Sequence, residues 1–320
     1  MSAYVSVAAA ARLHLGFLDM NGSLGRMFGG IGLAIDGPAT RLVLARETRN
    51  IVEGPEAERA TELLRRAQTA LGLAAHHRLR IDEAIPAHSG LGSGTQLALA
   101  IGAALRRLEE LPADPAEDAA LLGRGARSGL GAGLFRLGGL VVDGGRGAHT
   151  RTPPVISRLD FPPEWRILLI SDPEAVGLHG AQEKEAFATL PKLTEAAAGE
   201  LCRRATMQAL PALAERDLAA FGEAITRIQE IVGDYFAPAQ GGRRFTSARV
   251  AALAARLAAL GATGVGQTSW GPTGFAFVAS APKAQELAAA VAREAQGLDL
   301  TIASGLNDGA KIDAVYAQIA

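Results

Sequence analysis

The residues of this sequence that could do chemistry gather first in PAHSGLGSGT, residues 86–95. Gly90, Gly92 and Gly94 alternate with Leu91 and Ser93, and an apolar stretch follows at once. Glycine reaches left-handed backbone conformations at little cost and has no β-carbon, so successive glycines let backbone N–H groups converge on an anion. A helix that begins there adds unpaired N–H groups and the positive end of its dipole. The spacing predicts a phosphate site whose ligands are Ser89, Gly90, Gly92, Ser93, Gly94 and Thr95.

This loop differs from the two common phosphate-binding signatures. A Walker A loop needs Gly-Lys-Ser/Thr, and a dinucleotide-binding fold needs G-x-G-x-x-G. A glycine-rich turn in front of a buried helix, with no ligand, accounts for the local pattern equally well. The hydroxyls of Ser89, Ser93 and Thr95 could serve as donors or face Mg²⁺. The segment by itself leaves these alternatives open.

Strands and helices alternate around this loop without the regular βαβ repeat of a parallel sheet, which favours an α+β fold. Residues 95–110 are apolar on nearly all sides, so we expect a helix buried beneath a sheet. The glycine-rich stretch 16–38 is interpreted as a hairpin or loop system, and the proline-rich stretch 152–165 as a linker. Strands are predicted at 3–10, 39–46, 77–85, 138–145, 166–173 and 298–304, with two more within 261–280. Further helices are predicted at 56–72, 181–190, 194–210, 212–233, 247–260 and 282–296.

Length and composition exclude several classes of protein. A chain of 320 residues is long enough for two domains, and the proline-rich stretch places their boundary between residues 155 and 156. The formal net charge of -1 argues against a nucleic-acid partner. Cys202 is the single cysteine, which excludes an internal disulfide and a cysteine-cluster metal site. No signal-peptide pattern and no long apolar span is present, so we expect a cytoplasmic protein without membrane contact.

Three motifs resemble the signatures of the GHMP kinase superfamily. The loop Pro86-x-x-x-Gly90-Leu91-Gly92-Ser93-Gly94 resembles its phosphate-binding motif, ARLHLGFLD at 11–19 its first motif, and GVGQTSWGPTGFAF at 264–277 its third. The resemblance spans the whole chain. It implies a two-domain α+β fold, with residues 1–155 similar to domain 2 of ribosomal protein S5 and a ferredoxin-like domain at 156–320. The active site is then expected in the cleft between them.

Four longer segments resemble one branch of the superfamily, the β-ribofuranosylaminobenzene 5′-phosphate synthases of tetrahydromethanopterin biosynthesis. These segments lie at 12–36, 127–145, 235–247 and 266–277. The resemblance implies a Mg²⁺-dependent pentosyl transferase that acts on small molecules. It transfers ribose 5-phosphate from phosphoribosyl pyrophosphate to 4-aminobenzoate or 4-hydroxybenzoate. The products are a C-riboside 5′-phosphate, carbon dioxide and pyrophosphate.

The chemistry of this reaction suits the loop and the lysine-poor composition. Departure of pyrophosphate leaves an oxocarbenium-like cation, and fixed dipoles with Mg²⁺ can hold the departing charge. The aromatic ring attacks through its carboxylated carbon, and loss of the carboxylate restores aromaticity. The ring is its own electron sink, so neither pyridoxal phosphate nor a lysine Schiff base is needed. Only four lysines occur in the chain.

The first motif supplies the candidate catalytic residues Arg12, His14 and Asp19. Arg12 could hold a carboxylate or phosphate, and Asp19 could bind Mg²⁺ or form a charge pair. A strand-end salt bridge is the structural alternative. Arg26, flanked by glycine-containing segments, is a second candidate anion ligand, with an exposed surface charge as its alternative.

The third motif and the segments near it supply candidate substrate-binding residues. Gln267, Thr268 and Ser269 offer donors for a 5′-phosphate, and Trp270 could stack on the aromatic acid or the sugar. Arg127 precedes a second glycine stretch that we expect to serve packing. Asp172 follows a strand, where it could bind a metal or cap a turn.

Two other functions remain open at this point. An ATP-dependent small-molecule kinase is the main alternative, although GQTSWGPTG at 266–274 departs from the glycine series that the third motif of the kinases carries. A metabolite-binding protein without catalysis is the other. The sequence does not choose between amino- and hydroxybenzoate, and its alanine-rich helices are compatible with a homodimer.

Overall fold

Two sheets organise the chain in the computed structural model, which describes residues 2–178 and 180–316. The first sheet has the order β11-β1-β2-β4-β3, and β5 pairs with both β2 and β6. Its strands are β1 (Ser2–Asp19), β2 (Phe28–Glu47), β3 (Ile51–Glu53), β4 (His76–Glu83), β5 (Leu140–Asp143), β6 (Val155–Leu159) and β11 (Lys311–Tyr316). The second sheet, β10-β7-β9-β8, is antiparallel throughout. Its strands are β7 (Arg166–Ser171), β8 (Thr263–Gln267), β9 (Gly274–Val278) and β10 (Asp299–Ala303). The predicted α+β class is confirmed.

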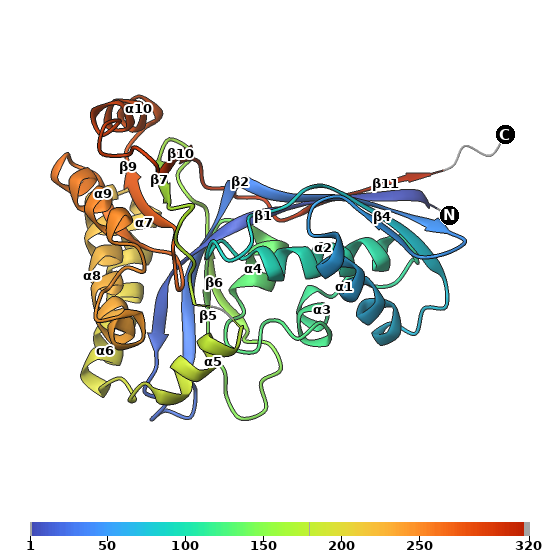
Figure 1. Ribbon diagram of the computed structural model, residues 1–320. Helices are drawn as coiled ribbons and strands as arrows, with labels where there is room; N and C mark the ends of the chain where they lie inside the picture. Colours follow the sequence, from blue (N-terminus) through green and yellow to red (C-terminus); the bar gives the residue numbers. More distant parts are fainter. Residues whose placement is uncertain (1, 179, 317–320) are drawn as a thin grey trace.

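Helices cover one face of the first sheet, as Figure 1 shows for α1 to α4. They are α1 (Ala57–Ala70), α2 (Ser93–Leu108), α3 (Pro115–Leu121) and α4 (Leu130–Leu137). Side chains of β1 alternate between buried and partly exposed from Val5 to Leu13, so one face of the strand enters the core. The segment 97–105 of α2 is buried on all sides, as its apolar sequence predicts.

The remaining helices are α5 (Gly180–Thr189), α6 (Glu195–Arg204), α7 (Leu210–Glu215), α8 (Leu218–Phe236), α9 (Ala248–Ala259) and α10 (Ala281–Ala290). Among them, α8, α9 and α10 pack against the second sheet, and α6 and α8 also contact β1 (Figure 1). One hydrophobic cluster joins the two halves, because it contains Leu13 and Leu15 of β1 together with Phe221 of α8 and Phe275 of β9. The first strand is therefore shared by both halves of the core.

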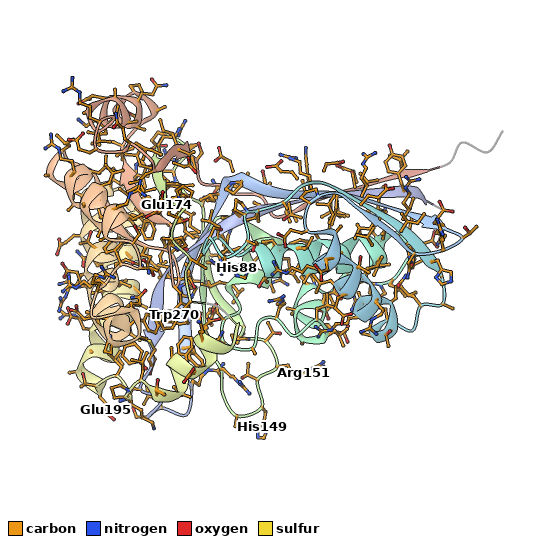
Figure 2. The ribbon with its side chains drawn as sticks, in the orientation of Figure 1. His88, His149, Arg151, Glu174, Glu195 and Trp270 are labelled. Carbon is orange, nitrogen blue, oxygen red and sulfur yellow. The ribbon has the colours of Figure 1, made fainter. Side chains whose placement is uncertain are left out.

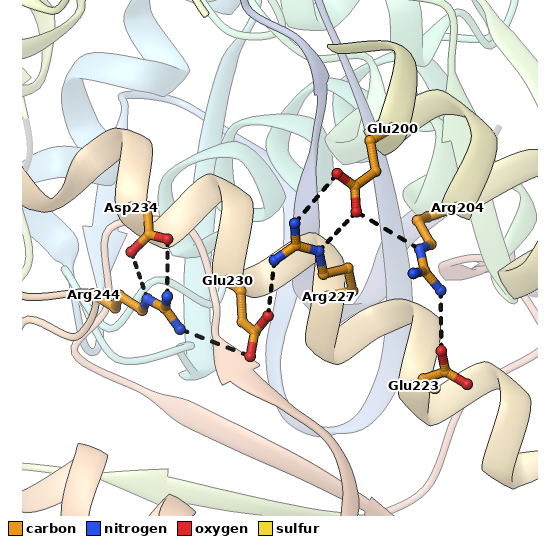
Figure 3. A network of polar contacts seen from close by, with 7 residues as sticks. All are labelled: Glu200, Arg204, Glu223, Arg227, Glu230, Asp234 and Arg244. Carbon is orange, nitrogen blue, oxygen red and sulfur yellow. Dashed lines mark hydrogen bonds and ion pairs between the residues drawn. The ribbon is translucent and has the colours of Figure 1, made fainter. Parts of the chain in front are cut away.

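A network of ion pairs fastens α6 to α8 on the surface (Figure 3). Arg227 of α8 donates from Nε to Oε1 of Glu200 at 2.7 Å. The network continues from Arg227 through Glu230 to Arg244. These side chains are roughly two-fifths exposed, so water and salt screen most of their attraction.

The hairpin alternative predicted for 16–38 is confirmed, because β1 and β2 pair antiparallel around a short connection. β1 runs to Asp19 and β2 starts at Phe28, so the connection spans only residues 20–27. The glycines lie inside strands because α4 packs directly on them: a β-carbon at Gly30 or Gly32 would lie 3.0 or 2.9 Å from Cδ1 of Leu130. Glycine in a strand often marks such a close approach rather than a loop.

The predicted linker at 152–165 contains a strand, and the C-terminal strand was not predicted. β6 pairs with β5, and the prolines lie on either side of it. β11 pairs with β1, so residues 311–316 return to the first sheet. The domain boundary between residues 155 and 156 stays a prediction. The strands at 155–159 and 311–316 both belong to the first sheet, which the N-terminal half forms.

Candidate active site

The predicted phosphate loop joins β4 to α2 and lies against the third motif. Gly90 and Gly92 adopt φ angles of 80° and 88°, in the left-handed region that favours glycine. Gly92 precedes the first residue of α2, so the N–H groups of the first helical turn open beside the loop. A β-carbon at Gly90 would lie 2.6 Å from the carbonyl oxygen of Thr268. Glycine is therefore required there by contact with the third motif as well as by backbone conformation.

Three motifs meet at the carbonyl oxygen of Gly90. Arg12 of β1 donates to it from Nη1 at 2.6 Å, and Thr268 donates to it from Oγ1 at 3.0 Å. The backbone N–H of His14 donates to the same Thr268 oxygen at 2.9 Å. The backbone N–H of Arg12 donates to the carbonyl oxygen of Leu91 at 3.0 Å. These bonds link residues distant in the sequence, so they fix the first motif, the loop and the third motif as one unit.

Arg12 is a partly buried cation. Burial lowers the pKa of its guanidinium to about 10, against an opposing attraction from Glu183 of α5. Oε1 of Glu183 also pairs with Nη2 of Arg127 at 2.7 Å and accepts from Nε1 of Trp270 at 3.2 Å. Two arginines thus share the charge of one carboxylate. Desolvated guanidinium groups with little neutralisation suit an anionic ligand.

His14 is held neutral. Burial, with a smaller contribution from the charge of Arg12, lowers the pKa of its imidazole to about 3. Its Nε2 is buried without a hydrogen-bond partner among the described residues. His14 also lines a cavity of about 20 Å³, beside Phe17, Phe236 and Ser269. At neutral pH this side chain is therefore uncharged and a weak base, and it supplies no positive charge to the site.

An aromatic cluster stands next to these charges. The Trp270 ring centroid lies 4.1 Å from that of Phe236 and 5.4 Å from that of Phe187. The guanidinium of Arg127 lies 4.7 Å from the centroid of Phe187. Trp270 is buried at 3% exposure, so its ring is part of the core as well as a neighbour of Glu183. In Figure 2, Trp270 and His88 of the loop lie in the middle of the view, whereas His149 and Arg151 lie on a loop that projects away.

Several predicted site residues lie together and others do not. Arg12, His14, Gly90, Gly92, Thr268, Trp270 and Arg127 form the group just described. Asp19 lies seven residues along β1 from Arg12, about 23 Å away in a strand. Its Oδ1 accepts from the N–H groups of Asn21 and Gly22, so Asp19 shapes the turn after β1. The structure thus separates the third predicted catalytic residue from the other two.

Arg26 also lies away from the phosphate loop. Its Nε donates to the carbonyl oxygen of Gly144 at 2.7 Å, and its Nη2 to that of Gly145 at 2.6 Å. The guanidinium holds two loops together, and its Nε and Nη2 are both bonded to carbonyl oxygens. The prediction of an anion ligand at this position gains no support from this geometry.

The other predicted ligands have defined local partners. Ser89 donates from Oγ to the carbonyl oxygen of Pro86 at 2.7 Å, and it fixes the turn. Gln267 is bonded through both ends of its amide, to Thr246 N–H and to Gln240. Ser269 has a left-handed φ of 54°. Ser93, Gly94 and Thr95 open α2. Their roles in ligand binding stay predictions.

Asp172 is occupied within the second half of the molecule. Oδ2 accepts from Ser247 Oγ at 2.6 Å, and Oδ1 lies 3.3 Å from Nη1 of Arg249. Across residues 2–178 and 180–316, no group of three or more His, Cys, Asp and Glu side chains is arranged to hold a metal ion. Metal binding at Asp172 stays a prediction. Within the same residues, no helix is long and apolar enough to cross a bilayer.

Sequence reasoning missed two carboxylates. Glu183 lies in a predicted helix, and nothing in its neighbours separates it from a solvent-exposed acid. Asp143 ends β5 fully buried and accepts from Ser128 Oγ, Gly129 N and Gly145 N at 2.9 to 3.0 Å. Burial raises the pKa of Asp143, and these hydrogen bonds oppose the rise. The signal in the sequence was an aspartate between an apolar strand and two glycines.

Known proteins resemble this chain along most of its length. Family profiles for the GHMP kinases N terminal domain and GHMP kinases C terminal match residues 56–135 and 209–296. The chain is 34% identical over 233 residues to the Beta-ribofuranosylphenol 5'-phosphate synthase of Archaeoglobus fulgidus, covering 69% of this chain and 74% of that protein. It is 30% identical to the protein of the same name from Methanothermobacter thermautotrophicus, covering 94% and 96% of the two chains.

Solved structures are similar in fold. The homoserine kinase of Cytophaga hutchinsonii matches with a TM-score of 0.70 over 98% of both chains, at 17% identity. Identity this low is informative about the fold alone, and it confirms the two-part GHMP architecture that the motifs predict. Together with the sequence relatives, the meeting of the three motifs at Gly90 leads to one assignment. The chain belongs to the GHMP kinase superfamily and, within it, to the family of enzymes named beta-ribofuranosylphenol 5′-phosphate synthases.

Proposed function

We propose that this protein catalyses decarboxylating phosphoribosyl transfer from phosphoribosyl pyrophosphate to 4-hydroxybenzoate or 4-aminobenzoate, a step of tetrahydromethanopterin biosynthesis. The observation that carries the proposal is the partly buried Arg12 guanidinium bonded to Gly90 of the phosphate loop at the start of α2. A partly desolvated cation and a helix N-terminus at one point suit a strongly anionic substrate. Since the relatives are named for a ribofuranosylphenol, we expect 4-hydroxybenzoate to be the better acceptor.

The reaction breaks two bonds and forms one. The bond from the anomeric carbon to pyrophosphate breaks, and pyrophosphate keeps the electron pair. The carboxylated ring carbon then forms a bond to the anomeric carbon. The bond from that ring carbon to the carboxylate breaks, its electrons return to the ring, and carbon dioxide leaves. No net proton transfer is required, which agrees with a site whose histidine is neutral.

The residues of this chain act chiefly on charge and position. The N–H groups at residues 92–94 and the Arg12 guanidinium stabilise negative charge as it develops on pyrophosphate. Arg127, held by Glu183, is in reach of the acceptor carboxylate if the ring lies along the Phe187 and Trp270 side of the site. The apolar cluster excludes water, which would otherwise trap the oxocarbenium-like cation.

Magnesium fits this site only as a partner of the substrate. It keeps several waters and usually takes one or two carboxylates together with phosphate oxygens. Glu183 is the carboxylate beside Arg12 and would hold it from the protein side. When bound, Mg²⁺ would supply positive charge to the leaving pyrophosphate.

The test is a balanced product assay. Purified protein is incubated with Mg²⁺, phosphoribosyl pyrophosphate and carboxyl-labelled 4-hydroxybenzoate or 4-aminobenzoate, and labelled carbon dioxide and pyrophosphate are measured together. We expect equal release of both. Arg12→Gln should lower the rate about 100-fold or more, because it removes a fixed charge from the leaving group. Arg41→Gln, at an exposed arginine paired with Glu83, is the matched control. Absence of both products alongside consumption of ATP would reject the proposal.

A further inference from the structure

A second cavity lies beside the start of α2 and takes no part in the contacts described so far. Its volume is about 610 Å³, and it is formed by α1 and the segment after α3. Its lining residues are Glu56, Ala57, Glu58, Arg59, Glu62, Leu63, Arg66 and Arg124. The fold thus places three arginines around one opening, at the end of α2 that carries the phosphate loop.

These guanidinium groups converge on the loop and on one another. A β-carbon at Gly94 would overlap the guanidinium of Arg59 and lie 3.2 Å from Nη1 of Arg124. A β-carbon at Gly123 would lie 3.3 Å from Nη2 of Arg66. Gly94 therefore gives two arginines direct access to the first turn of α2. Arg66 completes the group from the neighbouring turn.

The charges of this cluster are poorly balanced. Nε of Arg124 is buried and has no hydrogen-bond partner among the described residues. Burial, followed by the charges of Arg59 and Arg66, lowers the pKa of Arg124. Arg59 pairs with Glu56 at 3.3 Å, whereas in residues 2–178 and 180–316 no carboxylate forms an ion pair with Arg66 or Arg124.

The acidic residues of the cavity do not cancel this charge. Glu58 and Glu62 are exposed, and the carboxylate of Glu62 is bound to Arg65 at 2.9 Å on the outer face of α1. The three arginines are only half exposed. Glu56 is taken up by Arg59, and Glu58 and Glu62 lie at the rim, so Arg66 and Arg124 stay without a paired carboxylate among the described residues. An arrangement of mutually repelling cations, one with a buried unpaired N–H, is stabilised when an anion lies between them.

We propose that the cavity formed by Arg59, Arg66 and Arg124 binds a phosphate group of the phosphoribosyl donor. This inference rests on the proposed function, since it places one end of that substrate. The donor carries two phosphate-containing groups, its pyrophosphate and its 5′-phosphate. One of these lies in the arginine cavity, and the N–H groups of the first turn of α2 extend the same site toward Arg12.

The experiment measures binding of two probes, inorganic pyrophosphate and ribose 5-phosphate, by isothermal titration calorimetry. Arg66→Gln and Arg124→Gln should each weaken binding of one probe by about 10- to 100-fold, the usual effect of losing a charge-assisted hydrogen bond. The probe affected identifies which phosphate the cavity holds. Arg66→Lys keeps the charge and should bind with intermediate affinity. Arg65→Gln, one position away on the exposed face of α1, is the matched control and should bind like the unaltered protein.

The outcomes separate this inference from the proposed function. Unchanged affinity for both probes in the Arg66→Gln and Arg124→Gln variants would overturn the inference, as would equal losses in Arg66→Lys and Arg66→Gln. Altered probe binding in a protein that releases no carbon dioxide from labelled 4-hydroxybenzoate would retain the cavity and reject the reaction. Release of carbon dioxide at the same donor KM in all variants would retain the reaction and reject the cavity.

Discussion

The neutral state of His14 makes the stability of the protein depend on pH in a defined way. Its imidazole pKa falls from 6.5 in an unfolded chain to about 3 in the folded protein, mainly through burial. Between these two values the unfolded chain binds a proton that the folded protein does not. Acidification therefore favours unfolding throughout that window, and the effect is absent above about pH 6.5.

The size of the effect follows from the two pKa values. Between pH 7 and pH 5, His14 alone should lower the free energy of unfolding by about 2 kcal/mol. The replacement His14→Phe removes the titration and keeps a ring against Phe17, whose centroid lies 4.4 Å away. That variant should lose about 2 kcal/mol less than the unaltered protein over the same interval.

The assay is urea unfolding at pH 7 and pH 5, with the free energy obtained at each pH for both proteins. His149→Gln is the matched control, because His149 is exposed on a loop (Figure 2) and should leave the pH dependence unchanged. Equal losses of stability in the unaltered protein and in His14→Phe would show that His14 titrates alike in both states. The assignment of a neutral imidazole at the site would then fail.

Two further predictions concern stability away from the loop. Asp143→Asn should lower the free energy of unfolding by about 2–4 kcal/mol, because an amide NH₂ would face donors that now bond to the buried carboxylate. Thermal unfolding measures this loss of stability. A loss below about 1 kcal/mol would contradict the prediction. Arg227→Ala should change the free energy of unfolding by no more than about 1 kcal/mol, because the ion pairs of Figure 3 are exposed. In 0.5 M salt this change should become smaller still. A larger, salt-independent loss would mean that this network is a structural support of α8.

The sequence was most informative where backbone conformation and periodicity decide the structure. The glycines at 90 and 92 require left-handed φ, and both have it. The all-round apolar pattern of 97–105 predicts a buried helix, and α2 is one. Both features are local, so neighbouring residues suffice to predict them. The same reasoning allowed a hairpin at 16–38 but gave no reason for Gly30 and Gly32, because their role is to admit α4, which comes much later in the chain.

Contacts between distant segments decided which candidate residues meet. Arg12 and Asp19 lie in one motif, but an extended strand separates their side chains while bringing Arg12 to Gly90 and Thr268. Glu183 reaches the same point from α5, and no spacing in the sequence relates it to Arg12. The charge of a site is thus harder to predict than its backbone, because each ion pair depends on how whole elements pack.

The distribution of charge connects the two proposed parts of the site. Arg12 and Arg127 share the single carboxylate of Glu183, and Arg66 and Arg124 have no ion-pair partner among the described residues. Leaving partly buried guanidinium groups underneutralised costs stability, and the cost is offset when a polyanion binds. A substrate with a phosphate group at each end would neutralise both clusters at once, one on either side of the first turn of α2. The protein is accordingly expected to be measurably more stable with the phosphoribosyl donor than with the aromatic acid alone.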